Sequence, residues 1–281
     1  MTPIRFHLLQ AGHCTHPECA VMRGGSWSSV RFPALCGVFE HPQRGVVLFD
    51  TGYSPRFIDA TQPFPERAYR WVTPVTLAPA DTLVAQLARL GIPADEVRHV
   101  IISHYHGDHI AGLKDFPQAR FWSTRADHDA LRSRSRLGNL LHGCLPALLP
   151  PDFATRLDFA DDARPMALPS EFHPFERGFD LFGDGSLAGV PLPGHSTGQM
   201  GLAFFRADGR PVLLAADACW TRRALDADAL PSWIASRVFD SQRNYRATFA
   251  KLRALAASNS GVAIVPSHCE RTWEDWTNAA R

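Results

Sequence analysis

The chain lacks the features that mark membrane, exported and nucleic-acid-binding proteins. It has no apolar run of about 18 residues, the length that a membrane-spanning helix needs. Its N-terminus carries only a four-residue apolar patch, too short for the core of an export signal. It also lacks runs of Lys or Arg, and its 29 basic and 28 acidic side chains leave a formal net charge of +1. The sequence therefore predicts neither a membrane nor a nucleic acid as a partner.

Cysteine is sparse as well, with six residues in a chain of 281. Without an export signal, these cysteines predict free thiols in a reducing compartment, and hence a cytoplasmic protein. Hydrophobic residues make up 45% of the chain, enough to bury a sizeable core. We predict a single domain over residues 1–281. A Pro-rich segment at about 136–178 is a possible cap or interface insertion, and it is the candidate contact of a homodimer.

The apolar pattern alternates between the two-residue period of strands and the 3.6-residue period of helices. Strands are expected at residues 4–10, 34–41, 45–52, 97–103, 119–123, 186–194, 200–207, 211–217 and 261–270. Helices are expected at residues 81–91, 124–135 and 240–258. This order predicts a layered α/β architecture with helices outside packed sheets.

The stretch SHYHGDH, residues 103–109, concentrates four potential metal ligands at the end of an apolar strand. Residues two apart share a face at a strand end, so His104 and His106 can bind one ion. Gly107 allows a sharp turn, after which Asp108 and His109 can face a second ion. Four side chains cannot hold two ions alone, so further ligands are needed. Three candidates follow later apolar runs: His195, Asp217 and His268.

These five His and two Asp predict a catalytic centre with two divalent metal ions. With one Asp shared, each ion receives three or four protein ligands and keeps room for water, which is typical of catalytic rather than structural sites. Imidazole and carboxylate ligands favour zinc, with Fe, Mn or Co as alternatives. A His-rich loop can also be plain polar surface, but that interpretation leaves the three downstream ligands without a role.

The ordered set resembles the motifs of the metallo-β-lactamase superfamily. LFDTG, HYHGDH and PGHSTGQ carry the resemblance together with the later Asp and His, from about residue 34 to 270. The resemblance implies an αββα sandwich, with Asp50 of FDTG as a buried carboxylate that supports the His-rich loop. It also implies how the ligands divide: His104, His106 and His195 on the first metal, Asp108, His109 and His268 on the second, and Asp217 between them.

Within the superfamily, the nearest resemblance is to lactonase-like and related small-ester hydrolases. Acyl-homoserine lactonases typically carry a Tyr three residues after the bridging Asp, and that position here is Trp220, whose indole N–H can donate but cannot titrate. Cys219 would share the strand face of Asp217 and is a conceivable ligand, but we prefer Asp217, which argues against a β-lactamase. Segments 13–33, 53–79 and 136–178 are expected to build the pocket. Its candidate lining residues are Trp220, Tyr105, Tyr69, Trp71 and His13.

The ligand set predicts metal-assisted hydrolysis of a small ester, with a lactone as the first choice. A hydroxide between two ions about 3.5–4 Å apart attacks the carbonyl, and one metal stabilises the oxyanion. Asp108 passes a proton to the leaving group. One alternative is glyoxalase II-like thioester hydrolysis, for which the Arg-rich segment 125–136 offers the basic cluster. Another is a non-hydrolytic iron redox or metal-binding protein, although diiron reductases of this superfamily tend to carry Glu in place of His106.

Three other motifs give weaker hypotheses. GHSTG fits the nucleophile elbow of serine hydrolases, and Ser196, Asp217 and His268 occur in triad order, but a strand-like sequence follows where the elbow needs a helix. The single DTG lacks the second copy that an aspartic protease needs. HCTHPEC, residues 13–19, has poor spacing for a zinc knuckle and is predicted to be pocket lining or plain loop.

Overall fold

The computed structural model describes residues 1–279, which build two β-sheets packed face to face. The first sheet has seven strands, in the order β4 (Val75–Thr76), β1 (Arg5–Pro17), β2 (Ser29–His41), β3 (Gly45–Phe49), β5 (Val97–Ile101), β6 (Arg120–Ser123) and β7 (Leu157–Phe159). The second has six, in the order β13 (Ala263–Pro266), β12 (Pro211–Ala216), β11 (Met200–Phe205), β10 (Ala188–Pro191), β9 (Arg177–Asp180) and β8 (Arg164–Ala167).

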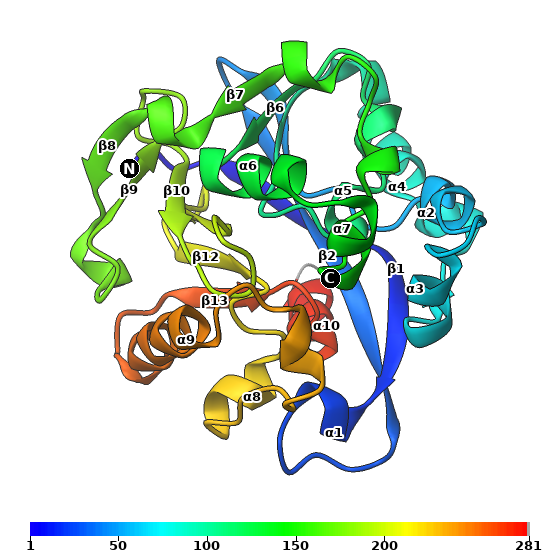
Figure 1. The fold of residues 1–281 in the computed structure, drawn as a ribbon. Coiled ribbons are helices and arrows are strands. Elements are labelled where there is room, and N and C mark those ends of the chain that lie inside the picture. The colour runs from blue at the N-terminus through cyan, green and yellow to red at the C-terminus, as the bar shows by residue number, and fades with distance from the viewer. Residues whose placement is uncertain (280–281) are drawn as a thin grey trace.

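Helices cover the outer faces of both sheets (Figure 1). The α-helices are α1 (Glu18–Val21), α2 (Pro55–Ala60), α3 (Arg67–Val72), α4 (Leu83–Arg89), α5 (Gly107–Ile110), α6 (Arg125–Ser133), α7 (Arg136–Leu141), α8 (Arg222–Asp226), α9 (Gln242–Ala257) and α10 (Glu270–Ala279). The 3₁₀ turns are η1 (Pro79–Asp81), η2 (Ala94–Glu96), η3 (Leu113–Asp115), η4 (Pro146–Leu148), η5 (Phe153–Thr155), η6 (Ala160–Asp162), η7 (Ser170–Phe172) and η8 (Ala235–Val238). Within residues 1–279, no helix combines the length and the apolar character needed to cross a bilayer.

Three apolar clusters correspond to the three interfaces between four layers. The middle cluster joins the facing sides of the sheets, for example Phe39 of β2 with Phe204 of β11, whose ring centroids lie 4.8 Å apart. A second cluster packs α2, α4 and α5 on the first sheet, and a third packs α8 and α9 on the second. The predicted αββα sandwich is therefore confirmed.

The direction of the strands brings the loops that carry the predicted metal ligands to one edge of the two sheets. Strands β3, β5, β6 and β7 run parallel, as do β12 and β13. The carboxyl ends of parallel strands meet at the same edge of a sheet, where α/β folds place their sites. The loops after β3, β5, β12 and β13 therefore approach one another across the two sheets.

The segment 136–178 differs from the predicted cap or insertion. Its strand β7 extends the first sheet, and β8 forms the edge of the second by pairing with β9. It thus completes both sheets. Most of its Pro residues lie in or beside the short turns, and Pro165 lies in the edge strand β8, where a missing N–H costs little. Only its first part, α7 with the turn that follows, lines the cavity described below.

Candidate metal centre

Each predicted ligand lies just after a strand, at the edge where the two sheets open. His104 and His106 follow β5, His195 follows β10, Asp217 follows β12 and His268 follows β13. Gly107 starts the short helix α5, which carries the remaining Asp and His of the loop. Because the strands are fixed by sheet pairing, their ends place these side chains with little freedom.

The seven side chains meet as two adjacent groups. In each group, one ligand atom per residue lies within 4.8 Å of the others. One group is His104, His106, His195 and Asp217, and the other is Asp108, His109 and His268. Six of the seven are buried, and Asp108 is partly exposed toward the cavity.

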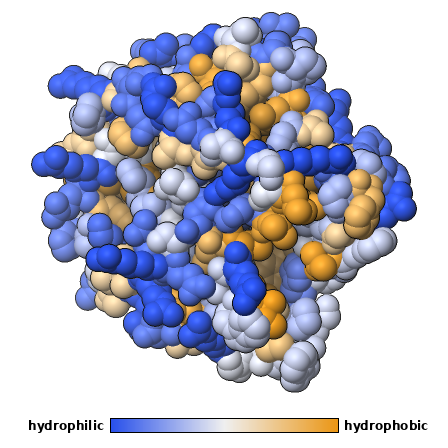
Figure 2. Space-filling view, viewed as in Figure 1, coloured by the Kyte–Doolittle hydropathy of each residue, from blue (hydrophilic) through white to orange (hydrophobic). Residues whose placement is uncertain are grey.

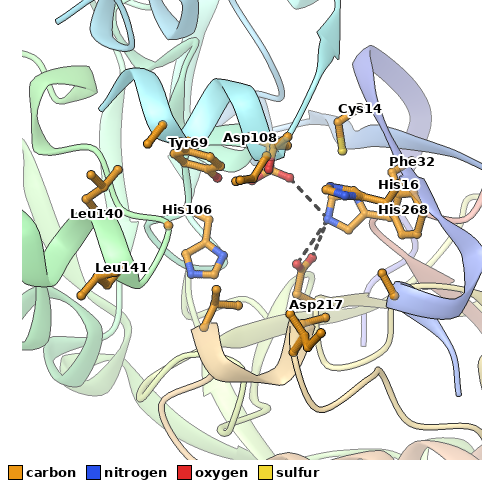
Figure 3. Close-up of a pocket in the computed structure, with 18 of the residues that line it drawn as sticks. Cys14, His16, Phe32, Tyr69, His106, Asp108, Leu140, Leu141, Asp217 and His268 are labelled. Carbon is orange, nitrogen blue, oxygen red and sulfur yellow. Dashed lines mark hydrogen bonds and ion pairs between the residues drawn. The ribbon is translucent and has the colours of Figure 1, made fainter. Parts of the chain in front are cut away.

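The carboxylate of Asp217 lies between the two groups. Its Oδ2 is 3.2 Å from Nε2 of His195, and its Oδ1 is 3.3 Å from Nε2 of His109 and 3.1 Å from Nε2 of His268. On the other side of His268, Oδ2 of Asp108 lies 3.4 Å from the same Nε2. Figure 3 shows Asp108, His268 and Asp217 pointing toward one another, with His106 turned toward the same space.

Several ligand atoms in this centre make no hydrogen bond within the protein. Within the described chain, Nε2 of His104, Nε2 of His109 and Oδ1 of Asp217 are buried without a hydrogen bond. A buried polar atom without a partner costs about 1–3 kcal/mol, and three such atoms in one cluster point to a bound group. Imidazole nitrogens and carboxylate oxygens are ligands of zinc and similar divalent cations. The residues present therefore fit a pair of metal ions.

A layer of hydrogen bonds orients the ligands from behind. Oδ2 of Asp50 accepts from Nδ1 of His109 at 2.7 Å and from the Ser103 hydroxyl at 2.7 Å, and its Oδ1 accepts from the Ser103 N–H at 2.8 Å. Asp50 adopts a left-handed backbone, φ 59°, which aims its carboxylate under the loop. Nδ1 of His268 donates to the carbonyl of Pro33 at 2.8 Å. These bonds leave the Nε2 atoms of His109 and His268 directed at the centre.

Burial and charge set the protonation of the imidazoles. Burial lowers the pKa of His106 to about 4, and burial holds the pKa of His104 and His195 well below the usual value. Neutral imidazoles offer the lone pairs that a metal needs. At His109 burial acts in the same direction, but the carboxylates around it, led by Asp50, outweigh it and raise the pKa well above the usual value. A cation at this position would replace that proton.

Two aspartates that the sequence analysis missed hold the loop that carries His195. Asp127 of α6 accepts from the Gly198 N–H at 2.7 Å and from the Ser196 hydroxyl at 2.8 Å. Asp240 accepts from both the N–H and the hydroxyl of Thr197, at 2.7 and 2.6 Å. Both aspartates lie in segments without a motif, so only the tertiary structure reveals them. The Ser196 hydroxyl is thus directed at a carboxylate and not at His268, which removes the serine-hydrolase alternative.

Trp220 and Cys219 follow Asp217 but make different contacts. The Trp220 indole N–H donates to Oδ2 of Asp217 at 2.9 Å, and its ring lies against His195. The Cys219 thiol donates to the carbonyl of Thr221 at 3.0 Å and is buried in the cluster under α8 and α9. Cys219 belongs to neither ligand group. Ligation by Cys219 is therefore wrong for this geometry, because the chain turns after Asp217 and the strand alternation ends.

A cavity of about 660 Å³ opens above the centre. Its floor includes His106, Asp108, His195, Asp217 and His268. Its walls are mainly apolar and include Phe32, Tyr53, Phe64, Val72, Leu140 and Val238. Figure 3 shows Leu140 and Leu141 of α7 on one side and Phe32 and His16 on the other. Tyr69 and Trp220, two of the predicted lining residues, are in these walls.

Three predicted lining residues are absent from the cavity wall. Tyr105 is buried and packs on Phe153, because the alternation that brings its His neighbours to one side sends it to the other. Trp71 is 66% exposed, because about 100° per residue in α3 turns it away from the face of Tyr69. His13 faces away for the same reason as Tyr105. Cys14 and His16 of β1 line the cavity, so the pocket-lining interpretation of residues 13–19 is correct for these two.

With the fold and the centre described, comparison with known proteins places the chain in a class. It belongs to the metallo-β-lactamase superfamily, whose family model matches residues 30–268. It is 28% identical to the N-acyl homoserine lactonase AttM of Azorhizobium caulinodans, over 99% of this chain and 98% of that protein. It is 31% identical to a probable metallo-hydrolase of Mycobacterium tuberculosis, over 72% of this chain and 62% of that protein.

Solved structures agree on the fold. A crystal structure of an N-acyl homoserine lactone hydrolase with N-hexanoyl-L-homoserine at its catalytic metal centre superposes with a TM-score of 0.71 at 17% identity, covering 98% of this chain and 97% of that one. The dizinc quorum-quenching lactonase AidC superposes with a TM-score of 0.64 at 15% identity, covering 94% and 87%. The predicted family, its lactonase-like branch and the prediction of a hydrolase are confirmed.

Proposed function

We propose that this protein hydrolyses a small ester, with a lactone as its substrate, using two divalent metal ions held by the seven clustered side chains. One observation carries the proposal: two adjacent groups of ligand side chains, with the Asp217 carboxylate between them, lie at the floor of an apolar cavity. Relatives named as lactonases, similar over 99% of this chain, support a lactone. Zinc as the metal and a cytoplasmic location are parts of the same proposal.

The chain's own residues have defined tasks in this reaction. Two divalent ions would supply Lewis acidity toward water and toward the ester carbonyl. The imidazoles, Asp108 and Asp217 would hold these ions. Asp50 and the Pro33 carbonyl keep the imidazoles of His109 and His268 in position. Asp108 is the one ligand that is partly exposed to the cavity, so its carboxylate can take a proton from water and pass it to the leaving alkoxide. Water adds across the ring C–O bond, which gives one hydroxy acid.

The cavity walls favour an apolar substrate over a charged one. Among residues 1–279, no Lys or Arg lines the cavity. In the Arg-rich segment 125–136, Arg125, Arg134 and Arg136 pair with carboxylates that do not line the cavity. A glutathione thioester carries carboxylates that would need a cationic group in the wall. The cavity wall therefore favours a lactone with an apolar substituent over a glutathione thioester.

Turnover with defined metal loading tests the proposal. The full chain would be stripped with a chelator, reloaded with zinc, iron, manganese or cobalt, and given lactones, thioesters, aryl esters and phosphodiesters. We expect about two metal ions per chain, lactone turnover that chelation abolishes, and recovery with zinc. Full turnover without metal would overturn the metal-dependent reaction. A loaded protein with a redox-active iron signal and no ester turnover would support the redox alternative instead.

A further inference from the structure

Exposed apolar side chains gather at the mouth of the cavity. Among residues 1–279, nine large hydrophobic side chains are exposed, and five of them line the cavity: Phe64, Val72, Leu137, Leu141 and Ile234. Trp71 and Trp233, exposed by 66% and 63%, adjoin two of these five. We call residues 62–73, 132–142 and 230–238 the mouth rim. Apolar exposure on this protein is thus concentrated at one place instead of scattered.

The three segments of the mouth rim form one continuous surface. Arg136 of α7 bonds the Glu66 carboxylate and the Phe64 carbonyl, which ties the second segment to the first. The ring of His142 donates to the carbonyl of Val238 at 3.3 Å, which ties it to the third. Figure 2 shows hydrophobic residues gathered near the centre of this face, in the region of α7, with hydrophilic side chains beside them.

The mouth rim is cationic although the whole chain is nearly neutral. Its three segments contain six arginines and one acidic residue, Glu66. Two of the arginines are neutralised, Arg136 by Glu66 and Arg134 by Asp240. The other four have no ion-pair partner among the described residues: Arg67, Arg70, Arg132 and Arg237. The net charge of +1 therefore conceals a basic patch, which the charge of the whole chain does not reveal.

Exposed Trp, exposed aliphatic side chains and Arg without an ion-pair partner are the combination found on proteins that lie in the headgroup region of an anionic bilayer. We propose that the mouth rim docks on the surface of an anionic lipid membrane, with the cavity opening toward the lipid. A symmetric contact with a second copy is disfavoured, because a two-fold axis would place the cationic segments opposite one another. A substrate in the cavity does not account for Trp71 and Trp233, which lie outside the cavity lining.

Docking of this kind adds to the proposed function without depending on it. If the substrate is a lactone with an apolar chain, as proposed above, that chain partitions into lipid and can enter the cavity from there. The membrane contact itself is measured without substrate. A failed lactone assay and a failed docking assay are therefore separate results.

Vesicle sedimentation with the metal-loaded full chain tests the docking. We expect binding to vesicles of phosphatidylglycerol mixed with phosphatidylcholine, weak binding to phosphatidylcholine alone, and release as salt rises from about 0.05 to 0.5 M. Trp71→Ser combined with Trp233→Ser should weaken binding about tenfold or more, because each removes a large apolar contact. Arg67→Gln combined with Arg132→Gln should weaken it by about tenfold, through lost charge alone.

The controls substitute an exposed apolar side chain and an exposed Arg outside the mouth rim. Leu90→Ser and Arg98→Gln change an exposed Leu and an exposed Arg elsewhere and should leave vesicle binding unchanged. The Trp and Arg double variants should keep their metal content, which shows that they are folded. No binding to the anionic vesicles, or equal binding by the Trp double variant, would overturn the proposal. A dimer that the Trp substitutions dissolve, without vesicle binding, would overturn it in favour of a second copy.

Discussion

The floor and the mouth of the cavity are built on opposite principles. At the floor, buried imidazoles and carboxylates are delivered by strand ends and fixed from behind by groups such as Asp50 and the Pro33 carbonyl. At the mouth, the short helices α3 and α7, the turn η8 and the residues beside them present exposed apolar side chains. The difference indicates a division of work: the rigid floor determines the reaction, and the mouth determines which molecules reach it.

Removing the shared carboxylate of the floor should have the largest effect. Asp217→Ala leaves both ligand groups without the oxygen atoms that lie 3.1–3.3 Å from three imidazoles. We expect metal content to fall below about one ion per chain and kcat/KM for a lactone to fall by about 10³-fold or more. Elemental analysis and steady-state kinetics measure the two effects. His7→Gln, a surface His bonded to Glu40, is the control and should change neither. Normal metal content in Asp217→Ala would contradict the bridging position.

A smaller effect is expected from the carboxylate behind the floor. Asp50→Asn keeps the size of the side chain, and Asn tolerates the left-handed backbone at this position. Its amide group, however, would turn an N–H₂ toward the donors of His109 or Ser103, so one hydrogen bond is lost. We expect metal affinity to fall about 10–100-fold, measured by competition with a chelator. Unchanged affinity, with only the thermal stability lowered, would mean that Asp50 supports the fold and not the metal ligands.

The contrast between floor and mouth also explains what the sequence could predict. His195, Asp217 and His268 each follow an apolar run, so the pattern of strands alone places them at one edge. The sandwich follows from the same pattern. Asp127 was missed because its partners, the Ser196 hydroxyl and the Gly198 N–H, approach it only in the folded chain.

The pocket was harder to predict for a related reason. Tyr105, Trp71 and His13 lie next to residues that do face the centre or cavity, and only the local backbone decides which neighbour points inward. Aromatic residues in such segments serve packing as often as binding. The whole-chain charge balance likewise conceals the arginines of the mouth rim, because their excess is offset by acids elsewhere in the chain. The apolar pattern of the sequence thus predicts well where strands end, but it predicts poorly which way a side chain in an irregular segment points.

Enlarging a side chain in the cavity wall should change which substrates are accepted without affecting the metal centre. Leu140→Trp places a larger side chain in the wall formed by α7. We expect kcat/KM for lactones with long apolar chains to fall about tenfold while short-chain lactones are nearly unaffected, because a pocket discriminates through the volume it leaves. Kinetics over a series of chain lengths measures this shift. Leu90→Trp, outside the cavity, is the control. An equal loss for all chain lengths, or a loss of metal, would show that α7 supports the floor as well.

Trp220 contacts both the floor and the wall of the cavity. Its substitution should have a smaller effect than the substitutions of Asp217, Asp50 and Leu140. Its ring is part of the cavity wall, and its N–H donates to Oδ2 of Asp217 at 2.9 Å. Trp220→Phe keeps an aromatic wall but removes that hydrogen bond, which is worth about 1.5–3 kcal/mol to a charged acceptor. Since a bound cation would offset part of that loss, we expect metal affinity and kcat/KM to fall together by about 3–10-fold. Trp220→Tyr restores a donor of similar reach, so it should recover part of both.

Comparing Trp220→Phe with Trp220→Tyr shows whether Trp220 acts on the metal centre at the floor or on substrate choice at the mouth. If Trp220→Phe changes only the preference for chain length and leaves metal affinity as it was, Trp220 acts as part of the mouth and its bond to Asp217 is incidental. If both variants lose metal affinity equally, the shape of the indole matters and the N–H does not. If Trp220→Phe loses metal affinity and Trp220→Tyr recovers it, the hydrogen bond from residue 220 to Asp217 matters for metal binding. Trp220 would then be a wall residue that also supports the metal ligands of the floor.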